Sequence, residues 1–492
     1  MKETFSIMIP ILIPILTGLF LLANPAVKKR SVLLGIVSAG LIVTAMSVFA
    51  VILGDGDSFT LFYLTKTLPV YFKIDGIGRL FVTVVTVVWL AAGFFSFVYM
   101  KHEENEKRYF GFYLITYGVL IALDFSGNII TFYMFYELMT LLSMPLVLHT
   151  RSREAVMAGL KYLFYSFCGA YMVLFGIYFL NRFANTLSFT AGGVLNQELI
   201  GGREPFLLFV VFLMILGFGV KAGMFPLHGW LPTAHPVAPA PASAALSGII
   251  VKGGVLGIIR TVFYLFGADF IRDTWVQTLW LSLTLFTVFM GSMLAFREKV
   301  LKKRLAYSTV SQVSYILFGL AVLNPAAMEG ALLHVIAHAF VKCTLFLCAG
   351  AIIFQTGKTR VDELRGVGKQ MPILLWCYTI VSLALIGIPP TGGFLSKWYL
   401  AAGALDSGIP FFCWFGPVVL LVSALLTAGY LLPITVNGFL PGSDFDYEHL
   451  EKREPSMCMI LPVLILTVLA VAVGTFPAPV LSFLTDVIGK LV

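Results

Sequence analysis

The sequence predicts an all-α integral membrane protein with about fourteen transmembrane helices. The composition is 59% hydrophobic and 12% charged, whereas soluble proteins carry roughly a quarter charged residues. The apolar residues are gathered into blocks of about twenty, the length at which a helix spans a hydrocarbon core. Because the chain lacks ten-residue segments of alternating polarity, the pattern favours helices over a closed barrel.

The apolar blocks follow one another along the whole chain. The first block has no small-residue cleavage site, so we expect it to remain as a helix and not to be a removed signal peptide. The last stretch, 475–492, is too short to cross again and is expected along the surface. The expected spans are 5–23, 31–53, 77–99, 109–123, 128–148, 159–180, 206–224, 243–266, 274–295, 305–323, 329–355, 372–400, 414–436 and 457–475.

Basic residues are concentrated in the loops on one side of these spans. By this assignment nineteen lysines and arginines lie in loops of one side and seven on the other. Cytoplasmic loops carry such an excess, which predicts a multi-pass protein of the cell (inner) membrane with both termini on the outer side. The net charge of +8 is therefore explained by topology and does not indicate nucleic-acid binding.

Proline and glycine interrupt two spans, at 224–236 and at 387–394. Broken helices at corresponding positions of two halves are typical of inverted-repeat transporters. The breaks lie five spans apart, which predicts inverted five-helix repeats at 109–273 and 274–440, preceded by three helices in 1–108 and followed by a helix and tail in 441–492. The predicted broken-helix residues are Pro226, Pro232, Pro236, Pro389 and Pro390.

Cofactor motifs are missing from the sequence. The six cysteines fall in or beside apolar blocks without CxxC spacing, and no GxGxxG or P-loop occurs. We therefore expect no cofactor, no metal and no catalytic residue in this chain. Any nucleotide or redox chemistry would belong to another protein, which leaves open whether the chain is part of an enzyme.

Ionisable residues inside the spans are the strongest functional signal. Glu137, Lys221, Lys252, Lys342 and Lys397 lie well inside spans or at their interruptions. Each costs roughly 2.5–3.5 kcal/mol at the bilayer centre on insertion scales, so it must pair, lose its charge or face water. Desolvated lysines and nearby carboxylates can exchange protons. Glu137 could instead be a packing carboxylate, and Lys221 could snorkel to an interface.

Two histidines extend this set. His334, His338 and Lys342 are spaced by four residues, so they share a helical face about 12 Å long. This stripe favours a proton relay over a lone core histidine. Zinc binding by the two histidines is disfavoured because no glutamate lies between them. Sodium would need more oxygen ligands than one central carboxylate. Arg260 is interpreted as an interfacial anchor, and Lys161 could belong to the inner surface or to the path.

Several segments together resemble the proton-conducting antiporter-like subunits of respiratory complex I, membrane-bound hydrogenases and Mrp-type cation/proton antiporters. The resemblance covers most of the chain, about spans three to fourteen. The matching segments are YELM (136–139), VKAGMFPLHGWLP (220–232), the stretch from AHP (234–236) to residue 252, LAYSTVSQVSY (305–315), HAFVK (338–342) and GIPPTGGFLSK (387–397).

The resemblance implies a role for each residue of the path. Glu137 would pair with Lys221 as the input-side switch, and Lys252 would hand protons to the central axis. The stripe from His334 to Lys342 would carry the second half, with Lys397 as the exit-side group. Lys397 is Glu in some members of the family. Lysine here, with the modest chain length, favours the D-type member of Mrp antiporters or its counterpart in membrane-bound hydrogenases.

Two functions of different class follow. The first is a proton-translocating subunit of a larger complex, whose partners are other membrane subunits, paralogous antiporter-like subunits among them, with redox subunits in some hosts. Its transported ions are protons, with Na⁺ left open, and an antiporter-like subunit of a complex I-type NADH:quinone oxidoreductase is the alternative host. The second is a stand-alone secondary solute transporter, suggested by the inverted-repeat breaks.

Overall fold

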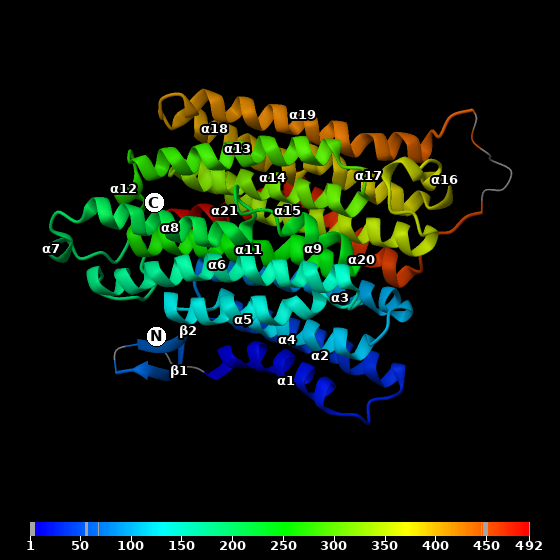
Figure 1. The fold of residues 1–492 in the computed structure, drawn as a ribbon, viewed down its shortest axis with the longest axis horizontal. Helices are drawn as coiled ribbons and strands as arrows, with labels where there is room; N and C mark the ends of the chain where they lie inside the picture. The colour runs from blue at the N-terminus through cyan, green and yellow to red at the C-terminus, as the bar shows by residue number, and fades with distance from the viewer. Residues whose placement is uncertain (1–4, 55–57, 67, 444, 446–450, 492) are drawn as a thin grey trace.

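The computed structural model describes residues 5–54, 58–66, 68–443, 445 and 451–491. The long helices run side by side along one axis, and the hairpin β1–β2 and the C-terminus lie at one end (Figure 1). We call this the hairpin end, and the end that carries α16 the opposite end. The predicted side of the termini depends in part on residues 1–4 and 492, which lie outside the described residues.

Helices dominate the first half of the chain. They carry the apolar blocks expected from the sequence, joined by short loops and turns. The elements are η1 (Phe5–Met8), α1 (Ile9–Ala23), α2 (Arg30–Ile52), α3 (Gly76–Tyr99), η2 (Met100–His102), α4 (Glu106–Asp124), α5 (Ile129–Val147), α6 (Arg153–Phe183), α7 (Gln197–Ile200), α8 (Glu204–Ala222), α9 (Leu231–Val237), α10 (Ala240–Ala245), η3 (Leu246–Ile250), α11 (Val251–Ile259), η4 (Arg260–Phe266) and α12 (Ala268–Ile271).

The second half is built in the same way. Its longest helix, α15, packs against α3, α10, α14, α17, α18 and α20. The elements are α13 (Trp275–Arg297), α14 (Leu301–Ala321), α15 (Pro325–Thr356), η5 (Val361–Glu363), α16 (Val367–Gln370), α17 (Pro372–Ile386), α18 (Gly392–Asp406), α19 (Phe412–Phe439), α20 (Met457–Thr475) and α21 (Ala478–Ile488).

Eleven helical segments within the described residues are long and apolar enough to cross a membrane. They confirm a multi-pass, mostly helical membrane protein. Three expected spans are not among the eleven. The first two coincide with α4 and α14, which begin with charged residues. The third, expected at 372–400, is divided into α17 and α18.

A β-hairpin corrects the prediction of an all-α chain. Strand β1 (Ser58–Thr65) pairs antiparallel with β2 (Leu68–Lys73), with Ser58 opposite Lys73. The segment is rich in aromatic and β-branched residues, which favour strands. It lies outside the apolar spans, where water can satisfy the outer backbone groups of a two-stranded sheet.

The helices on either side of the two sequence breaks end in the same way. Both α8 and α17 stop at a glycine with positive φ, 79° at Gly223 and 99° at Gly387. A glycine in this left-handed conformation is a common helix stop, because it carries no Cβ to clash. The chain then turns through the proline-rich segments 224–230 and 388–391 into α9 and α18.

Burial separates a central pair of helices from the rest. In the helix at 240–266, every residue of the most apolar 18-residue window is buried, and in α15 the buried share of that window is 94%. In α1, α2 and α6 the buried share is only 39%. Large apolar side chains such as Phe164 and Tyr171 on α6 remain exposed, as expected for a surface that faces lipid. The 240–266 helix contains two π-helical segments, η3 and η4, which flank the segment that carries Lys252.

Candidate functional site

Three side-chain hydroxyls surround the ammonium of Lys221 near the end of α8. Its Nζ donates to Thr140 Oγ1 at 2.7 Å, to Ser166 Oγ at 2.9 Å and to the Tyr162 hydroxyl at 3.1 Å. The Tyr162 ring also lies 4.4 Å from Nζ, within cation–π range. Lys221 is completely buried, so it does not snorkel to a surface. Helices α5 and α6 together supply a polar shell for a charge that the bilayer would otherwise exclude.

The break after α8 closes this shell from one side. Trp230, at the start of α9, donates its indole N–H to the carbonyl of Val220 at 2.8 Å. Its ring packs on Tyr162 with centroids 4.7 Å apart. The carbonyl of Val220 lies in the last turn of the helix and also accepts from the backbone N–H of Gly223 at 3.2 Å. The broken segment therefore both satisfies the helix end and covers Lys221.

Glu137 lies on α5 but does not contact Lys221. Its side chain is half-buried, and Oε1 has no hydrogen-bond partner among the described residues. The two charges interact electrostatically, yet the described ion pairs do not join them. The interaction of Glu137 with Lys221 is therefore electrostatic, while the hydrogen bonds of Lys221 go to the hydroxyl shell.

Lys161 lies beside the first break. Its Nζ donates to Thr233 Oγ1 on α9 at 3.0 Å and lies 5.9 Å from the centre of the Tyr165 ring. Tyr162, which holds Lys221, is the next residue along α6. The side chain therefore links α6 to the broken segment at the border of the Lys221 shell.

Lys252 contacts a histidine of α15. Its Nζ lies 2.6 Å from Nδ1 of His338 and donates to the carbonyl of Ser247 at 3.0 Å. An ammonium can only donate, so Nδ1 of His338 accepts and the ring proton is assigned to Nε2. The carbonyl of Ser247 belongs to the π-helical segment η3. Such segments leave backbone groups free for other partners and often occur at functional sites.

His334 carries the opposite tautomer. Its Nδ1 lies 2.9 Å from Ser396 Oγ on α18, and that hydroxyl donates to the carbonyl of Gly393. The serine proton is thereby used, so His334 Nδ1 is assigned as the donor and its Nε2 as a free acceptor. The His334 and His338 rings lie 5.9 Å apart, and the Nε2 of each is buried without a partner in the described chain. A donor nitrogen and an acceptor nitrogen are therefore available next to each other.

Lys342 joins the same network through hydroxyl groups. Its Nζ donates to the carbonyl of Leu305 at 3.1 Å, and Thr309 Oγ1 donates to the same oxygen at 2.9 Å. Thr309 lies 2.7 Å from Ser247 Oγ, and Ser247 also accepts from Lys252. The two central lysines are thus connected by a short polar chain between α14 and η3.

Lys397 follows the second break. Its Nζ donates to the last carbonyls of α17, those of Leu385 at 2.5 Å and Ile386 at 3.0 Å. These oxygens lie at the negative end of the helix dipole, where a cation is stabilised. The Tyr315 ring lies 4.9 Å from Nζ and also stacks on His334. Lys397 is thereby linked to the histidine stripe through an aromatic ring.

The proline residues form the two breaks. Phe225–Pro226 and Pro389–Pro390 are both cis peptide bonds. Pro232 and Pro236 lie in the short helix α9, and the Pro236 carbonyl accepts from Lys302 at 3.2 Å. Pro226, Pro389 and Pro390 therefore lie in the turns that follow Gly223 and Gly387, and Pro232 and Pro236 lie in the short helix after the first turn.

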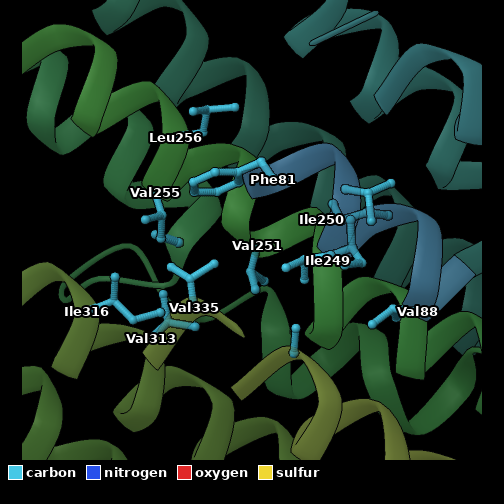
Figure 2. Close-up of a cluster of buried hydrophobic side chains, with 14 of the residues drawn as sticks. Phe81, Val88, Ile249, Ile250, Val251, Val255, Leu256, Val313, Ile316 and Val335 are labelled. Carbon is cyan, nitrogen blue, oxygen red and sulfur yellow. The ribbon is translucent and has the colours of Figure 1, made fainter. Parts of the chain in front are cut away.

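Apolar side chains enclose the middle of the site. Phe81 and Val88 from α3, Val251 and Val255 from α11, and Val335 from α15 form a buried apolar cluster (Figure 2), and Phe81 and Val335 also line a small cavity with Lys252. In such surroundings a hydrogen bond to a charge is strong, and a polar atom without a partner is costly. Among the described residues, no group of three or more His, Cys, Asp or Glu side chains could hold a metal ion.

Sequence reasoning missed several buried polar groups. Asp124, at the end of α4, is 2% exposed, although Glu137 was the only acidic residue expected inside a span. Arg260 is not an interfacial anchor, because it is 1% exposed and forms an ion pair with Asp75. His235 is fully buried on Phe346, and neither ring nitrogen has a partner in the described chain. These residues lie near or beyond the ends of expected spans, where polar residues are common. Their burial therefore depends on helix packing and is not visible in the sequence.

Comparisons with known proteins identify the family of the chain. Residues 126–432 match the family described as "NADH:quinone oxidoreductase/Mrp antiporter, TM", and residues 64–110 match "NADH-Ubiquinone oxidoreductase (complex I), chain 5 N-terminus". The N subunit of the NADH-quinone oxidoreductase of Desulforudis audaxviator is 31% identical over 422 residues, 83% of this chain and 82% of that protein.

A second relative and a solved structure cover nearly the whole chain. The D subunit of the Na(+)/H(+) antiporter of Alkalihalophilus pseudofirmus is 26% identical over 99% of this chain and 97% of its own. A chain of the Mrp complex from Dietzia sp. DQ12-45-1b has the same fold, with a TM-score of 0.86 and 21% identity over 99% of this chain and 98% of that one. The resemblance expected from the motifs is confirmed: the chain belongs to the family of antiporter-like membrane subunits shared by complex I-type oxidoreductases and Mrp antiporters.

Proposed function

We propose that the chain conducts protons across the membrane as one subunit of a larger complex. The observation that carries this proposal is the polar chain that joins Lys342, Lys252 and His338, with the His334 ring 5.9 Å from that of His338, enclosed by apolar side chains. Buried charges that serve only stability can often be replaced by apolar residues with no loss of stability. Proton transfer requires groups that gain and lose protons, which explains why ionisable residues occupy these buried positions.

The proposed path has seven members: Glu137, Lys221, Lys252, His334, His338, Lys342 and Lys397. Hydroxyl groups both donate and accept, so the shell of Lys221 can accommodate an ammonium or a neutral amine. The opposite tautomers of the two histidines suit transfer from Nε2 of one ring to Nε2 of the other through one water. Movement of a charge at one lysine then alters the proton affinity of the next by electrostatic interaction.

The architecture that suits this path has fourteen spans and two inverted five-helix repeats, 109–273 and 274–440. Helices α4, α14 and the α17–α18 pair, added to the eleven apolar segments, make up the fourteen. The repeat arrangement is supported by the paired breaks, since both begin at a positive-φ glycine and continue through a cis-proline turn. Segments 1–108 and 441–492 flank the repeats. Basic loops at the opposite end support an outer location for the hairpin end.

An Mrp-type antiporter, with this chain as its D-type member, or a membrane-bound hydrogenase is the proposed host. Lysine at position 397 and the full-length match to the D subunit of an antiporter support this assignment. A complex I-type oxidoreductase is the alternative host, supported by the match to the N subunit of such an enzyme. Paralogous membrane subunits are proposed partners, with redox subunits in the hydrogenase or oxidoreductase case.

Substitution of the path lysines tests the function. In inverted membrane vesicles that contain the whole complex, Lys221→Ala and Lys397→Ala should each lower proton translocation by more than about tenfold, because each removes a proton-carrying group. Lys303→Ala is the matched control, since Lys303 is an exposed lysine paired with Glu298. Translocation is followed by a pH-sensitive fluorescent dye. Wild-type rates in both alanine variants would refute the proposal.

Purification identifies the host and tests the second candidate. A tag on this chain should recover other membrane subunits after mild solubilisation, and mass spectrometry would name them. Iron–sulfur or nickel proteins would indicate a redox-driven host, and membrane subunits without redox proteins would indicate a cation/proton antiporter. A chain that comes out alone and transports a solute in liposomes would favour the stand-alone transporter, which the inverted-repeat breaks also suit.

A further inference from the structure

A second cluster of buried charges lies at the hairpin end, outside the proposed path. Arg260 in η4 forms a two-pronged ion pair with Asp75, with Nη2 donating to Oδ1 at 2.9 Å and Nη1 donating to Oδ2. The guanidinium lies 4.7 Å from the Phe189 ring and 4.6 Å from the Tyr264 ring. Asp75 also accepts from the backbone N–H of Gly78 at the start of α3. The pair is thus firmly held, although the path from Lys221 to Lys397 does not use it.

An open pocket of about 390 Å³ reaches this ion pair from the hairpin end. Asp75 and Tyr264 line it, together with Asp486 and Lys490 of the C-terminal segment. The carboxylate of Asp75 retains 22% exposure, whereas Arg260 retains 1%. The ion pair therefore lies at the boundary between a water-accessible pocket and the sealed interior.

Asp124 lies on the interior side of that boundary. Its Oδ2 is buried without a hydrogen-bond partner among the described residues, and it interacts electrostatically with Arg260. The first turn of α3, which begins after Asp75, packs directly on the Asp124 backbone at Gly78. A buried carboxylate without a partner is costly unless it exchanges a proton or binds water. Burial of an asparagine or a serine at this position would cost less free energy than burial of a carboxylate.

One small cavity connects Asp124 with the central lysine. Asp124 and Lys252 both line it, together with apolar residues such as Phe81 and Val335. Its space for a water molecule's centre is about 10 Å³, which is about what one water needs. The other residues that line the cavity are apolar or glycine, so Asp124 and Lys252 are its only ionisable lining residues. Two charged groups lie near Asp124: Lys252 of α11 lines the same cavity, and Arg260 of η4 interacts with Asp124 electrostatically. Arg260 in turn interacts with Asp75 and Tyr264, and Tyr71 of β2 interacts with Asp75 and Arg260.

We propose that Asp124 is a proton-relay residue that connects Lys252 to the hairpin-end pocket, with the Arg260–Asp75 ion pair as its gate. This proposal rests on the proposed function, because Asp124 would give the proposed proton path a further connection to water, at the hairpin-end pocket. A proton leaves Nζ of Lys252, crosses one water and binds Oδ2 of Asp124, so that both groups become neutral. When Arg260 turns from Asp75 towards Asp124, the guanidinium displaces the proton, which passes to water in the pocket. Each step is reversible.

Two substitutions of Asp124 test the relay in vesicles that contain the whole complex. Asp124→Asn, which cannot take up a proton, should lower proton translocation by about tenfold. Asp124→Glu should retain most of it, since the carboxyl group remains. Asp269→Asn is the matched control, because Asp269 is an exposed carboxylate at the same end, paired with Arg272. A wild-type rate in Asp124→Asn, with Lys221→Ala inactive, would overturn the relay and leave the proposed function standing.

The gate has a separate readout that does not depend on Asp124→Asn folding. Asp75→Asn removes one charge of the ion pair, so an imposed pH gradient across liposomes that contain the complex should collapse about tenfold faster. Adding Asp124→Asn to Asp75→Asn should restore the slow collapse, because the relay is then missing. An unchanged collapse rate in Asp75→Asn, or a leak that persists in the double variant, would overturn the proposal.

Discussion

Lys221 and Lys397 lie beside similar breaks in the chain, yet they are held by different chemistry. Lys221 comes before its break and is surrounded by three hydroxyl groups from α5 and α6. Lys397 comes after its break and binds two backbone carbonyls at the end of α17. Hydroxyls can donate to a neutral amine or accept from an ammonium, whereas carbonyls only accept. A neutral amine keeps two N–H donors and gains one acceptor lone pair, so the shell of Lys221 can supply a donor to that lone pair and the two carbonyls at Lys397 cannot.

The largest expected effect comes from replacing each lysine by arginine, which keeps the positive charge but does not release a proton. Lys221→Arg and Lys397→Arg should each lower proton translocation by about a hundredfold, measured with a pH-sensitive dye in vesicles that contain the complex. If Lys397→Arg remained active, Lys397 would act only as a fixed positive charge, and the two lysines would then differ in function as well as in their contacts.

The hydroxyl shell should matter next. Thr140→Val removes the shortest hydrogen bond of Lys221, and one such bond contributes about 1 kcal/mol or more, so the translocation rate should fall about fivefold. Thr344→Val is the matched control, since Thr344 is a buried threonine of α15 whose hydroxyl donates to the carbonyl of Phe340 in its own helix at 2.8 Å. Equal rates in the two valine variants would mean that the shell is not needed. The backbone partners of Lys397 offer no equivalent substitution.

Glu137 is a second difference between the two sites, because Lys397 has no described acidic contact. Glu137→Gln should lower translocation by only about two- to fivefold, since the carboxylate acts through space without a contact ion pair. The measurement is the initial rate in vesicles, with Glu154→Gln, an exposed glutamate of α6, as the control. A loss as complete as that of Lys221→Ala would instead indicate that Glu137 carries the proton itself.

The smallest effect is expected when only the hydroxyl of Tyr315 is removed, since the ring of this residue contacts both Lys397 and His334. Its hydroxyl donates to the carbonyl of Leu420 at 2.7 Å, away from both residues. Tyr315→Phe keeps the ring and should change the rate by less than about twofold, whereas Tyr315→Ala loses a cation–π contact of about 1 kcal/mol and should slow it about fivefold. Equal rates in both variants would remove the ring from the link between Lys397 and the histidines.

Much of the fold could be predicted because the bilayer imposes length and polarity locally. Each expected span corresponds to a helix or to an interrupted helix pair, and the two breaks were visible as Pro and Gly clusters. The hairpin 58–73 was missed because it lies between spans, where hydropathy carries little information. The π-helical segments beside Lys252 were missed for another reason: they depend on packing with α15 and α14, and no residue type marks them.

The sequence alone determined that this is a multi-pass membrane protein, which family it resembles, and which charges lie inside its spans. These properties follow from composition, block length and local motifs, because a charge in an apolar block is costly wherever the helix lies. Only the tertiary structure decided the partner of each charge. Lys221 binds hydroxyls and not Glu137, Lys252 meets His338, and Arg260 pairs with Asp75. Such contacts join residues far apart in the chain, so helix packing, and not local spacing, brings them together.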